Sequence, residues 1–505
     1  MTTHLDPARN FMSNLPPDHF LALPRPDVNA GPLIDAPDTT TLAAHDFDVD
    51  NRTGFMPPQP PLTRLPEQWE PWESVLDEAI AQRLQLADKP GLTNIERENA
   101  SRWQEHVREL PILPTLELKE SEVLLRRAHH VLAWIMHFYI RTLPPTTPDI
   151  RIPPPITVPL LQVSSHLQLP PVLTYSDDVL YNWALIEPVP LTFVSPAPAL
   201  DNLRCLTLFT GTRDEAEFYL ASARIELRGV RALSLMRATM DEAFVGDDIA
   251  IKRITTYLYS LAEVIGDLTK LLLAVREGCD PMVFYNQIRP WFRGADSDTH
   301  RKWIFEGLEL DPDLKQPTEL SGPSAGQSSL VHALDIFLGV DRYSHAEHST
   351  GAALTSSSSA PSFSRHTDAN RSNLQTSSSS SQLPESASPH PTSQGSSVSF
   401  LTRMQSYMPR HHRAFLRHLS ANPRPLRALV ESANDSAFTE AYNTAVTALK
   451  VFRDAHVRIV ALYIVVPARN GGRPEEELKG TGGTNSMKFV KSVRDQTAGA
   501  VIEES

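Results

Sequence analysis

Six long segments of this chain repeat their apolar residues every three or four positions. That spacing puts apolar side chains along one side of an α-helix, whereas a half-buried strand needs alternation at every second residue. The six segments are residues 120–142, 213–244, 247–278, 328–340, 400–421 and 435–466. Alternating patterns are scarce, and residues 150–172 hold six prolines, which favours a connector. The sequence therefore predicts an all-α protein with two helical lobes.

Two segments lack this periodicity and differ from the rest in composition. Residues 1–65 carry proline pairs and few sustained apolar stretches, so they cannot bury enough surface to offset chain entropy. Residues 344–399 contain 20 serines among 56 residues and few aliphatic side chains. We expect a disordered leader and a disordered serine-rich insert. The chain then has fewer domains than 505 residues would suggest at about 150 residues each.

Composition and charge exclude several classes of protein. A net charge of −13 argues against binding to nucleic acid or to an anionic membrane surface. Two cysteines, Cys205 and Cys279, are too few for a disulfide-stapled scaffold or a cysteine-rich metal site. No apolar run reaches the roughly 18 residues of a membrane span, and the first residues lack the pattern of a secretory signal. We expect a soluble, cytoplasmic protein.

Motifs of several common enzyme classes are absent. The sequence has no HExxH, CxxC, GxSxG, P-loop or GxGxxG pattern, which weakens zinc-protease, hydrolase, NTPase and dinucleotide-binding interpretations. Two glycine-containing segments remain. Residues 322–329 either cap a helix or line a ligand pocket with backbone and hydroxyl donors. Residues 479–484 form either a flexible linker or a mobile lid.

The segment 435–466 carries a histidine on its apolar face. Asp435 or Ser436 can cap the start of this helix, and Pro467 ends it. His456 shares a face with apolar residues, which is compatible with a buried core histidine or with an axial ligand of haem iron. Arg453, one turn earlier, favours the second interpretation because a guanidinium there can reach a haem propionate.

Several separated motifs, in this order, resemble the indoleamine 2,3-dioxygenase family. They are residues 169–175 (LPPVLTY), 179–183 (VLYNW), 284–289 (FYNQIR), 324–329 (SAGQSS), 406–415 (SYMPRHHRAF), 452–460 (FRDAHVRIV) and 480–484 (GTGGT). The resemblance runs from about residue 66 to the C-terminus, apart from the serine-rich insert. It implies a small N-terminal lobe and a large helical haem-binding lobe. The small lobe would span residues 66–185, and the large lobe 186–343 and 400–505.

The family's activity implies a cofactor and substrates. Haem b with ferrous iron would bind O2, and both oxygen atoms would add across the indole C2–C3 bond of L-tryptophan to give N-formylkynurenine. This is a step of tryptophan catabolism, the kynurenine pathway. The resemblance thus implies L-tryptophan and related indoleamines and O2 as partners, and a monomeric chain.

The resemblance also assigns roles around the haem. His456 matches the proximal iron ligand and Arg453 the propionate-side arginine. Asp335 matches the acid that pairs with this arginine. Ser324 and Ala325 match residues that line the pocket near the haem and the substrate.

Further positions match the family's substrate pocket. Tyr175, Val179, Phe218 and Ser222 match its distal side; Phe284 and Tyr285 match an aromatic pair near the indole, Arg289 the residue that takes the substrate carboxylate, and Thr481 the closing loop. Because no residue among them resembles a general base, the resemblance gives this chain a role in positioning substrate and excluding water.

Two positions depart from the family pattern. Tyr285 stands where a second phenylalanine is common, which is tolerable if its hydroxyl has a partner. Asp178 brings a carboxylate to a place where a neutral residue is expected. If it faces the haem, its charge is costly to bury and can disfavour substrate; otherwise it turns outward.

Other classes of function remain open alongside the enzyme. A non-catalytic haem protein or oxygen carrier could keep the fold and the iron. Such a carrier does not need Arg289, Ser222 or the loop 480–484, and all three are present, which favours the dioxygenase. An interaction scaffold with a kinase-modified serine-rich insert is a weaker alternative.

Overall fold

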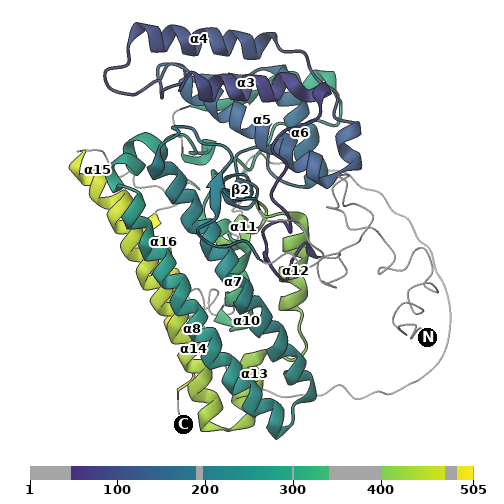
Figure 1. Cartoon of the computed structure of the whole chain (residues 1–505), viewed down its shortest axis with the longest axis vertical. Coiled ribbons are helices and arrows are strands. Elements are labelled where there is room, and N and C mark those ends of the chain that lie inside the picture. Colours follow the sequence, from purple (N-terminus) through teal and green to yellow (C-terminus); the bar gives the residue numbers. More distant parts are fainter. Residues whose placement is uncertain (1–46, 189–196, 298–300, 341–399, 472–485, 504–505) are drawn as a thin grey trace, which may run out of the picture.

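The computed structural model describes residues 47–188, 197–297, 301–340, 400–471 and 486–503. Helices dominate it and the strands are short, so the all-α prediction is confirmed. The helices fall into a small lobe, at the top of Figure 1, and a larger lobe below it. The serine-rich segment 344–399 and Thr481 lie outside the described residues.

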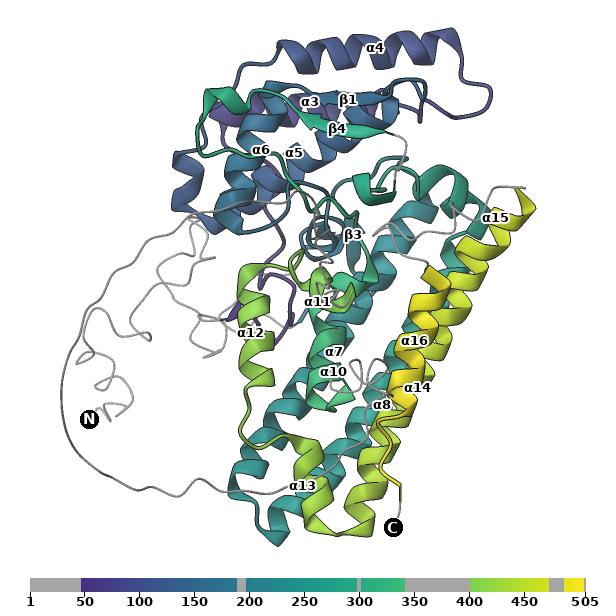
Figure 2. The ribbon, with the colours of Figure 1, turned by 180° about the vertical axis from the view of Figure 1, so that it is seen from behind.

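The small lobe packs helices around a short parallel sheet. Its elements are α3 (Glu70–Ala81), α4 (Asn94–Glu109), α5 (Glu122–Thr142), α6 (Pro154–Leu167), β1 (Asp149–Ile152) and β4 (Lys302–Phe305). Strands β1 and β4 pair with Ile150 opposite Trp303. Because β4 comes from much later in the chain, the segment around residue 303 returns to the small lobe, as Figure 2 shows.

The large lobe is built on three long helices that lie side by side, namely α7 (Arg213–Val245), α8 (Asp248–Gly278) and α14 (Ser436–Val460). Shorter helices pack around them: α9 (Pro281–Val283), α10 (Ser329–Phe337), α11 (Phe400–Gln405), α12 (Arg410–Ser420), α13 (Leu426–Ala433), α15 (Val466–Asn470) and α16 (Ser486–Ala498). Near the junction of the lobes, β2 (Trp183–Leu185) pairs with β3 (Leu203–Cys205) in antiparallel fashion.

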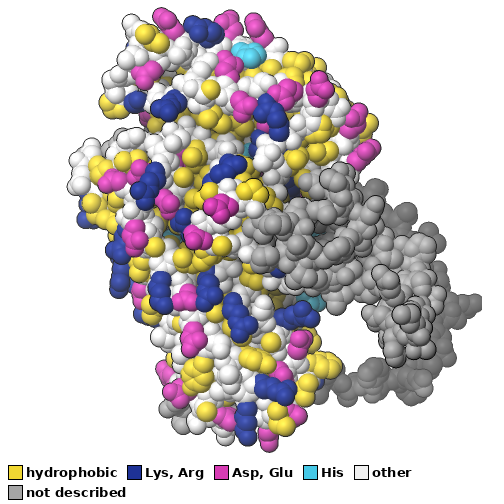
Figure 3. Space-filling view, in the orientation of Figure 1, with side chains coloured by type: hydrophobic (Ala, Val, Ile, Leu, Met, Phe, Trp, Pro, Cys, Tyr) yellow, Lys and Arg dark blue, Asp and Glu magenta, His cyan; other side chains and the backbone are white. Residues whose placement is uncertain are grey.

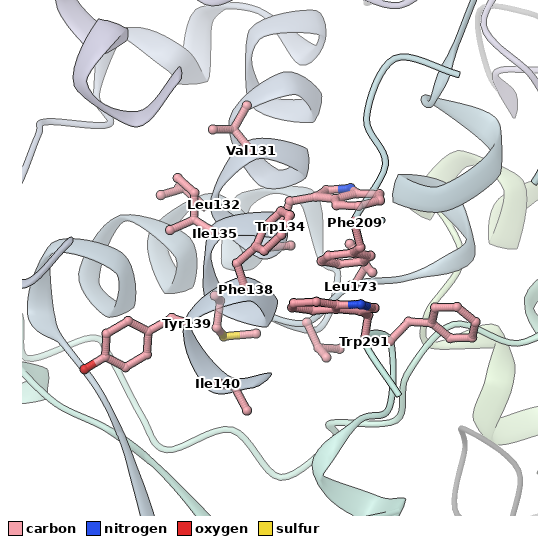
Figure 4. Close-up of a cluster of buried hydrophobic side chains, with 14 of the residues drawn as sticks. Val131, Leu132, Trp134, Ile135, Phe138, Tyr139, Ile140, Leu173, Phe209 and Trp291 are labelled. Atoms are coloured by element: carbon pink, nitrogen blue, oxygen red, sulfur yellow. The ribbon is translucent and has the colours of Figure 1, made fainter. Parts of the chain in front are cut away.

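A stack of aromatic rings joins the two lobes. The ring centroid of Trp134 on α5 lies 4.0 Å from that of Phe209, which lies 5.2 Å from that of Trp291 with ring planes 5° apart. Figure 4 shows these rings beside the apolar side chains of α5. Phe209 leads into α7, and Trp291 follows the π-helical turn η4 (Phe284–Ile288). The stack therefore holds both segments against the small lobe.

The three long helices and α10 begin at side chains that cap them. Thr212, Asp247, Ser328 and Asp435 each accept a hydrogen bond from a backbone N–H in the first turn of α7, α8, α10 and α14, respectively. Such a bond satisfies a donor that has no partner inside the helix. Of the two residues predicted to cap the last of these helices, Asp435 or Ser436, the structure shows Asp435.

The prediction of a connector over residues 150–172 is wrong. The segment forms β1 and then α6, which contains Pro159. Pro154 and Pro155 occupy the first turn of α6, where a missing N–H costs nothing because it would have no intrahelical acceptor. Pro159 removes one helical hydrogen bond, and burial of Leu160 and Val163 in the small-lobe core outweighs that loss.

Prolines also change two predicted helix boundaries. The predicted helix 400–421 divides into α11 and α12, because Pro409 disfavours a helical conformation for the residue before it. Pro467 does not end the helix that begins at Ser436. The chain continues through the π-helical turn η9 (Ala461–Val465) into α15, and Pro467 lies in the first turn of α15.

Residues 47–65 belong to the segment expected as a leader, and the structure describes them packed on the large lobe. Phe55 and Met56 are each 1% exposed. The Phe55 ring makes edge contacts with His412 and Phe415, at centroid distances of 4.9 and 5.5 Å. A short segment that buries single side chains shows no period in its sequence, which is why periodicity misses it.

The surface in Figure 3 mixes acidic and basic side chains over both lobes. Within the described residues, no helix has the length and apolar composition needed to cross a membrane.

Candidate functional site

A large cavity lies in the upper part of the large lobe, between α7, α14, α16 and the segment around Ala325. Its larger chamber holds about 1060 Å³ of space not filled by atoms, open mouth included, and the smaller chamber holds about 820 Å³. Tyr175, Ser222, Ala325 and His456 line both chambers. The two chambers therefore adjoin, with His456 at their common wall.

His456 presents a neutral imidazole to this cavity. Burial away from bulk water and the nearby positive charge of Arg453 lower the pKa of His456 to about 4. Its side chain is half-buried, because part of its surface faces the cavity. No described residue makes a hydrogen bond to either of its ring nitrogens. A lone pair on a neutral ring nitrogen is what a metal ion requires from histidine.

A second histidine of the cavity wall is already engaged. His332 on α10 lines the smaller chamber. Its Nε2 lies 2.9 Å from the carbonyl oxygen of Gly326, and its Nδ1 lies 3.4 Å from the side-chain nitrogen of Gln405. The Nε2–H thus donates to a carbonyl, and the ring cannot turn toward the cavity without leaving that oxygen unpaired. The geometry singles out His456.

A buried ion pair lies one turn before His456. Nη2 of Arg453 lies 2.5 Å from Oδ1 of Asp335 on α10, and both side chains are buried. Nη1 of Arg453 donates to the hydroxyl of Thr497 on α16 and to the carbonyl of Val493, at 3.3 Å for the latter. These bonds tie α10, α14 and α16 together beside the cavity. Such a pair needs both partners, since a lone buried charge is costly.

Aromatic rings form one wall of the larger chamber. The ring centroid of Phe218 on α7 lies 4.4 Å from that of Phe284 and 6.1 Å from that of Phe292. The Phe284 ring also meets that of Tyr463, at 5.5 Å. All four residues line the chamber. This surface excludes water and accepts a flat apolar ligand.

Arg289 brings a positive charge to the same chamber. Its side chain is 1% exposed and its guanidinium carbon lies 5.4 Å from the ring centroid of Tyr285. Tyr285 is buried but does not line the chamber; its ring instead lies against Arg289. A buried guanidinium at an apolar wall can bind a carboxylate through two parallel hydrogen bonds.

Tyr175 connects the cavity to a buried acid. Its hydroxyl donates to Oε1 of Glu226 at 2.9 Å, and the hydroxyl of Ser328 donates to the same oxygen at 2.7 Å. Oε2 of Glu226 is buried and has no hydrogen-bond partner in the described residues. Burial raises the pKa of Glu226 to about 7, although the two hydroxyl donors oppose this shift.

The raised pKa of Glu226 predicts a pH-dependent stability. A carboxyl with a folded-state pKa above its ordinary value of 4.5 stabilises the fold at low pH, and this contribution is lost as pH rises through 7. Glu226→Gln stays neutral and keeps an acceptor oxygen. We expect its free energy of unfolding, relative to wild type, to rise by about 2–3 kcal/mol between pH 5 and pH 8 in denaturant titrations.

Glu215→Gln serves as a comparison for the change to an amide and not for the pH dependence, because burial also raises the pKa of Glu215. Its two carboxylate oxygens accept from the backbone N–H groups of Phe209 and Thr210, at 2.8 and 2.7 Å. Glu215→Gln would set an amide NH2 against one of these donors, so it should destabilise the protein at both pH values. A Glu226→Gln variant with the same difference from wild type at pH 5 and pH 8 would contradict the shifted pKa.

Asp178 lines the larger chamber and does not turn outward. It lies in the π-helical turn η3 (Ser176–Leu180), directly before Val179. Its side chain is buried, and Oδ1 has no hydrogen-bond partner in the described residues. Burial, together with the negative charges of Asp177 and Glu215, raises the pKa of Asp178 well above its ordinary value.

The cavity gathers most of the residues predicted for the site. Those that line one chamber or both are Tyr175, Val179, Phe218, Ser222, Phe284, Arg289, Ser324, Ala325, Asp335, Arg453 and His456. Tyr285 stands behind Arg289, and Thr481 lies outside the described residues. The predicted turn at 322–329 does both things considered for it, since Ser328 caps α10 while Ser324 and Ala325 line the cavity.

The sequence interpretation missed the contribution of α16. Phe489 and Val490 line both chambers, and Val493 lines the smaller one. Val490, Val493 and Thr497 recur at three- and four-residue spacing, a helical signal that could have been found.

The site fits haem. Within the described residues, no group of three or more histidine, cysteine, aspartate or glutamate side chains could hold a bare metal ion. A haem iron needs only one protein ligand, because the macrocycle supplies the others. His456 offers that ligand between two largely apolar chambers, and Arg453 lines the smaller chamber. Ligand and walls therefore suit a flat apolar cofactor.

Comparison with known proteins agrees with this geometry. The family model for indoleamine 2,3-dioxygenase matches residues 43–500. The chain is 30% identical to an indoleamine 2,3-dioxygenase of Aspergillus candidus, over 91% of this chain and 98% of the relative. It is also 30% identical to an indoleamine 2,3-dioxygenase of Saccharomyces cerevisiae (82% and 90%) and 28% identical to a 6-hydroxytryptophan 2,3-dioxygenase of Fusarium equiseti (89% and 95%). The chain therefore belongs to the indoleamine 2,3-dioxygenase family and is an oxidoreductase of the dioxygenase type.

Proposed function

We propose that this dioxygenase opens the indole ring of L-tryptophan, adding both atoms of O2 across the C2–C3 bond to give N-formylkynurenine. The observation that carries the proposal is that His456 and Arg289 line the same apolar cavity. The first offers a neutral nitrogen to an iron, and the second offers a buried cation to an amino-acid carboxylate. A simple oxygen carrier needs only the first.

The cofactor in this proposal is haem b. When bound, ferrous haem supplies the activation of O2, which protein side chains cannot provide. His456 would hold the iron. Arg453, fixed by Asp335, would face a propionate, and Ser324 and Ala325 would line the pocket nearby.

The side chains of the larger chamber bind and orient the substrate. Arg289 takes the carboxylate in a bidentate contact, and its ring contact with Tyr285 holds the guanidinium in place. Phe218, Phe284 and Val179 pack against the indole and exclude water. Ser222 and Tyr175 complete the distal wall. Thr481 would belong to the loop that closes the site.

None of these residues acts as an acid or base in the proposal. Both oxygen atoms enter the product, so no proton has to leave the substrate for solvent. The contribution of the chain is orientation. A substrate held by its carboxylate and by aromatic walls reacts at a lower entropic cost, because its position is fixed beforehand.

We further propose that the enzyme acts as a monomer in the cytoplasm, in the catabolism of tryptophan and related indoleamines. Cys205 and Cys279 are both free thiols in the structure, which fits a reducing compartment.

The experiment that tests the function is turnover of L-tryptophan. Haem-loaded protein, reduced to the ferrous state and given L-tryptophan and 18O2, should produce N-formylkynurenine that carries two labelled oxygen atoms. Product with one labelled atom would exclude dioxygenase chemistry on this substrate. Stoichiometric haem binding without product would instead favour the non-catalytic haem protein.

A further inference from the structure

Asp178 and its neighbour Asp177 are two buried acids with opposite environments. Asp177 is satisfied by the fold: His129 Nδ1 lies 2.8 Å from Oδ1, and the backbone N–H and hydroxyl of Thr174 donate to Oδ2 at 2.9 and 2.7 Å. Asp178 is 4% exposed, and no described residue makes a hydrogen bond to its carboxyl. Asp177 therefore stabilises the fold through its hydrogen bonds, whereas the carboxyl of Asp178 makes no such contribution.

The charges around Asp178 disfavour the ionised form of its carboxyl. The charged groups that act on it are Asp177, its sequence neighbour, and Glu215 on α7, and both are negative. No described cation acts on it, so Arg289, which lines the same chamber, is not its ion-pair partner. Burial adds to the effect, because an ionised carboxylate there would lose its hydration without compensation. The Asp178 carboxyl in the wall of the larger chamber therefore favours its neutral, protonated form.

A neutral carboxylic acid offers one O–H donor and one carbonyl acceptor. Leaving both unpaired in an apolar pocket is unfavourable. Val179, Phe218 and Tyr219 line the same chamber, and Tyr219 lies near enough to Asp178 to interact with it electrostatically; these side chains suit an aromatic ring. A phenolic hydroxyl is a group that an aromatic ring can carry and that pairs with a carboxylic acid both as a donor and as an acceptor.

We propose that Asp178 is a specificity-determining residue that binds the ring hydroxyl of a hydroxylated tryptophan, so that this enzyme prefers hydroxyindole amino acids to tryptophan itself. The inference rests on the proposed function, because it needs Arg289 to hold the carboxylate of the same substrate. Arg289 and Asp178 line one chamber without forming a pair, so a single amino acid can engage one of them at its carboxylate and the other at its ring.

The size of the preference follows from the hydrogen bonds involved. A buried polar group in a binding site loses its hydration when a substrate binds. A substrate without a matching hydrogen-bonding group leaves this polar group unpaired and is therefore bound less well. We expect wild-type kcat/KM for at least one isomer with a hydroxyl on the benzene ring to exceed that for L-tryptophan by about tenfold or more.

The test compares wild type with Asp178→Val and Asp178→Asn on L-tryptophan and on its four isomers hydroxylated on the benzene ring. Asp178→Val removes donor and acceptor, so it should lower the hydroxylated-to-plain ratio of kcat/KM by about tenfold or more and raise kcat/KM for tryptophan. Asp178→Asn keeps both groups and should retain most of the preference. Dissociation constants from calorimetry should follow the same order. A fluorinated isomer of matching position controls for the size of the substituent.

The outcomes separate this inference from the proposed function. If wild type cleaves tryptophan but prefers no hydroxylated isomer, or if Asp178→Val leaves the ratio unchanged, the role of Asp178 is wrong and the dioxygenase stands. If Asp178→Val weakens plain and hydroxylated substrates alike, the acid contacts a group common to both, such as the indole N–H, and the proposal fails. If wild type cleaves none of these substrates, the proposed function itself fails.

Discussion

Replacing His456 with alanine is expected to abolish stoichiometric binding of haem. The imidazole is neutral at physiological pH because the pKa of His456 is lowered to about 4, and neither ring nitrogen is occupied by a described residue. Among the described histidines that line the cavity, it is the one with no hydrogen bond at its ring nitrogens, so removing it takes away the ligand best suited to the iron. Titration of haem into purified apo-protein, followed by Soret absorbance and by haem content after desalting, measures the effect.

The control for this variant is His332→Ala. His332 also lines the cavity, but its Nε2–H is donated to the carbonyl of Gly326, so it should be dispensable for the iron. The loss of haem in His456→Ala should not reflect unfolding, because His456 makes no described hydrogen bond and part of its surface already faces a cavity. Near-wild-type helicity by circular dichroism checks this. A normal Soret band in His456→Ala, or its loss only in His332→Ala, would overturn the assignment.

The sequence predicted the long helices because each one shows many turns of the same pattern. Helices α7, α8 and α14 pack an apolar stripe against one another, and their caps at Thr212, Asp247 and Asp435 are polar residues at the expected places. Helix α6 was missed because its prolines look disruptive, although two of the three occupy the helix's first turn. Local composition could not reveal the packing that outweighs Pro159.

The site was harder to predict because its geometry departs from the α-helix. In an α-helix, residues five apart point to different sides, yet Phe284 and Arg289 both line the chamber. The π-helical turn η4 between them makes this possible, with the N–H of Arg289 donating to the carbonyl of Phe284 at 2.8 Å. The turns η3 and η9 also contribute wall residues, among them Asp178 and Tyr463. A π-helical turn, which is wider than an α-helical turn, cannot be predicted from the spacing of apolar residues in the sequence.

Adjacent residues in one motif also took different places. The family resemblance implies that Phe284 and Tyr285 form an aromatic pair near the indole. Neighbouring residues on a helix, however, point in different directions. Phe284 faces the chamber, whereas Tyr285 lies against Arg289. For the same reason the sequence does not fix the direction of Asp178, whereas the fold shows that it lines the chamber.

Replacing Arg289 with alanine is expected to raise KM for L-tryptophan by about a hundredfold while leaving haem content unchanged. A buried guanidinium that binds a carboxylate through charged hydrogen bonds contributes about 1.5–3 kcal/mol, and its loss leaves the substrate charge in an apolar chamber. Steady-state kinetics of the haem-loaded variant, with Soret absorbance to verify loading, measures the change. Arg289→Lys keeps the positive charge but lacks the planar guanidinium, so its KM for L-tryptophan should lie between those of wild type and Arg289→Ala.

The substrate supplies a second control for this variant. Tryptamine lacks the carboxylate, so wild type should handle it about as poorly as Arg289→Ala handles tryptophan. The activity of Arg289→Ala on tryptamine should be little lower than its activity on tryptophan, because the variant has already lost the contact between Arg289 and the carboxylate. If Arg289→Ala lost activity equally, relative to wild type, on tryptophan and on tryptamine, Arg289 would not act on the carboxylate. It would instead support the wall of the chamber through its contact with Tyr285. An unchanged KM for tryptophan would mean that the carboxylate is held elsewhere in the chamber.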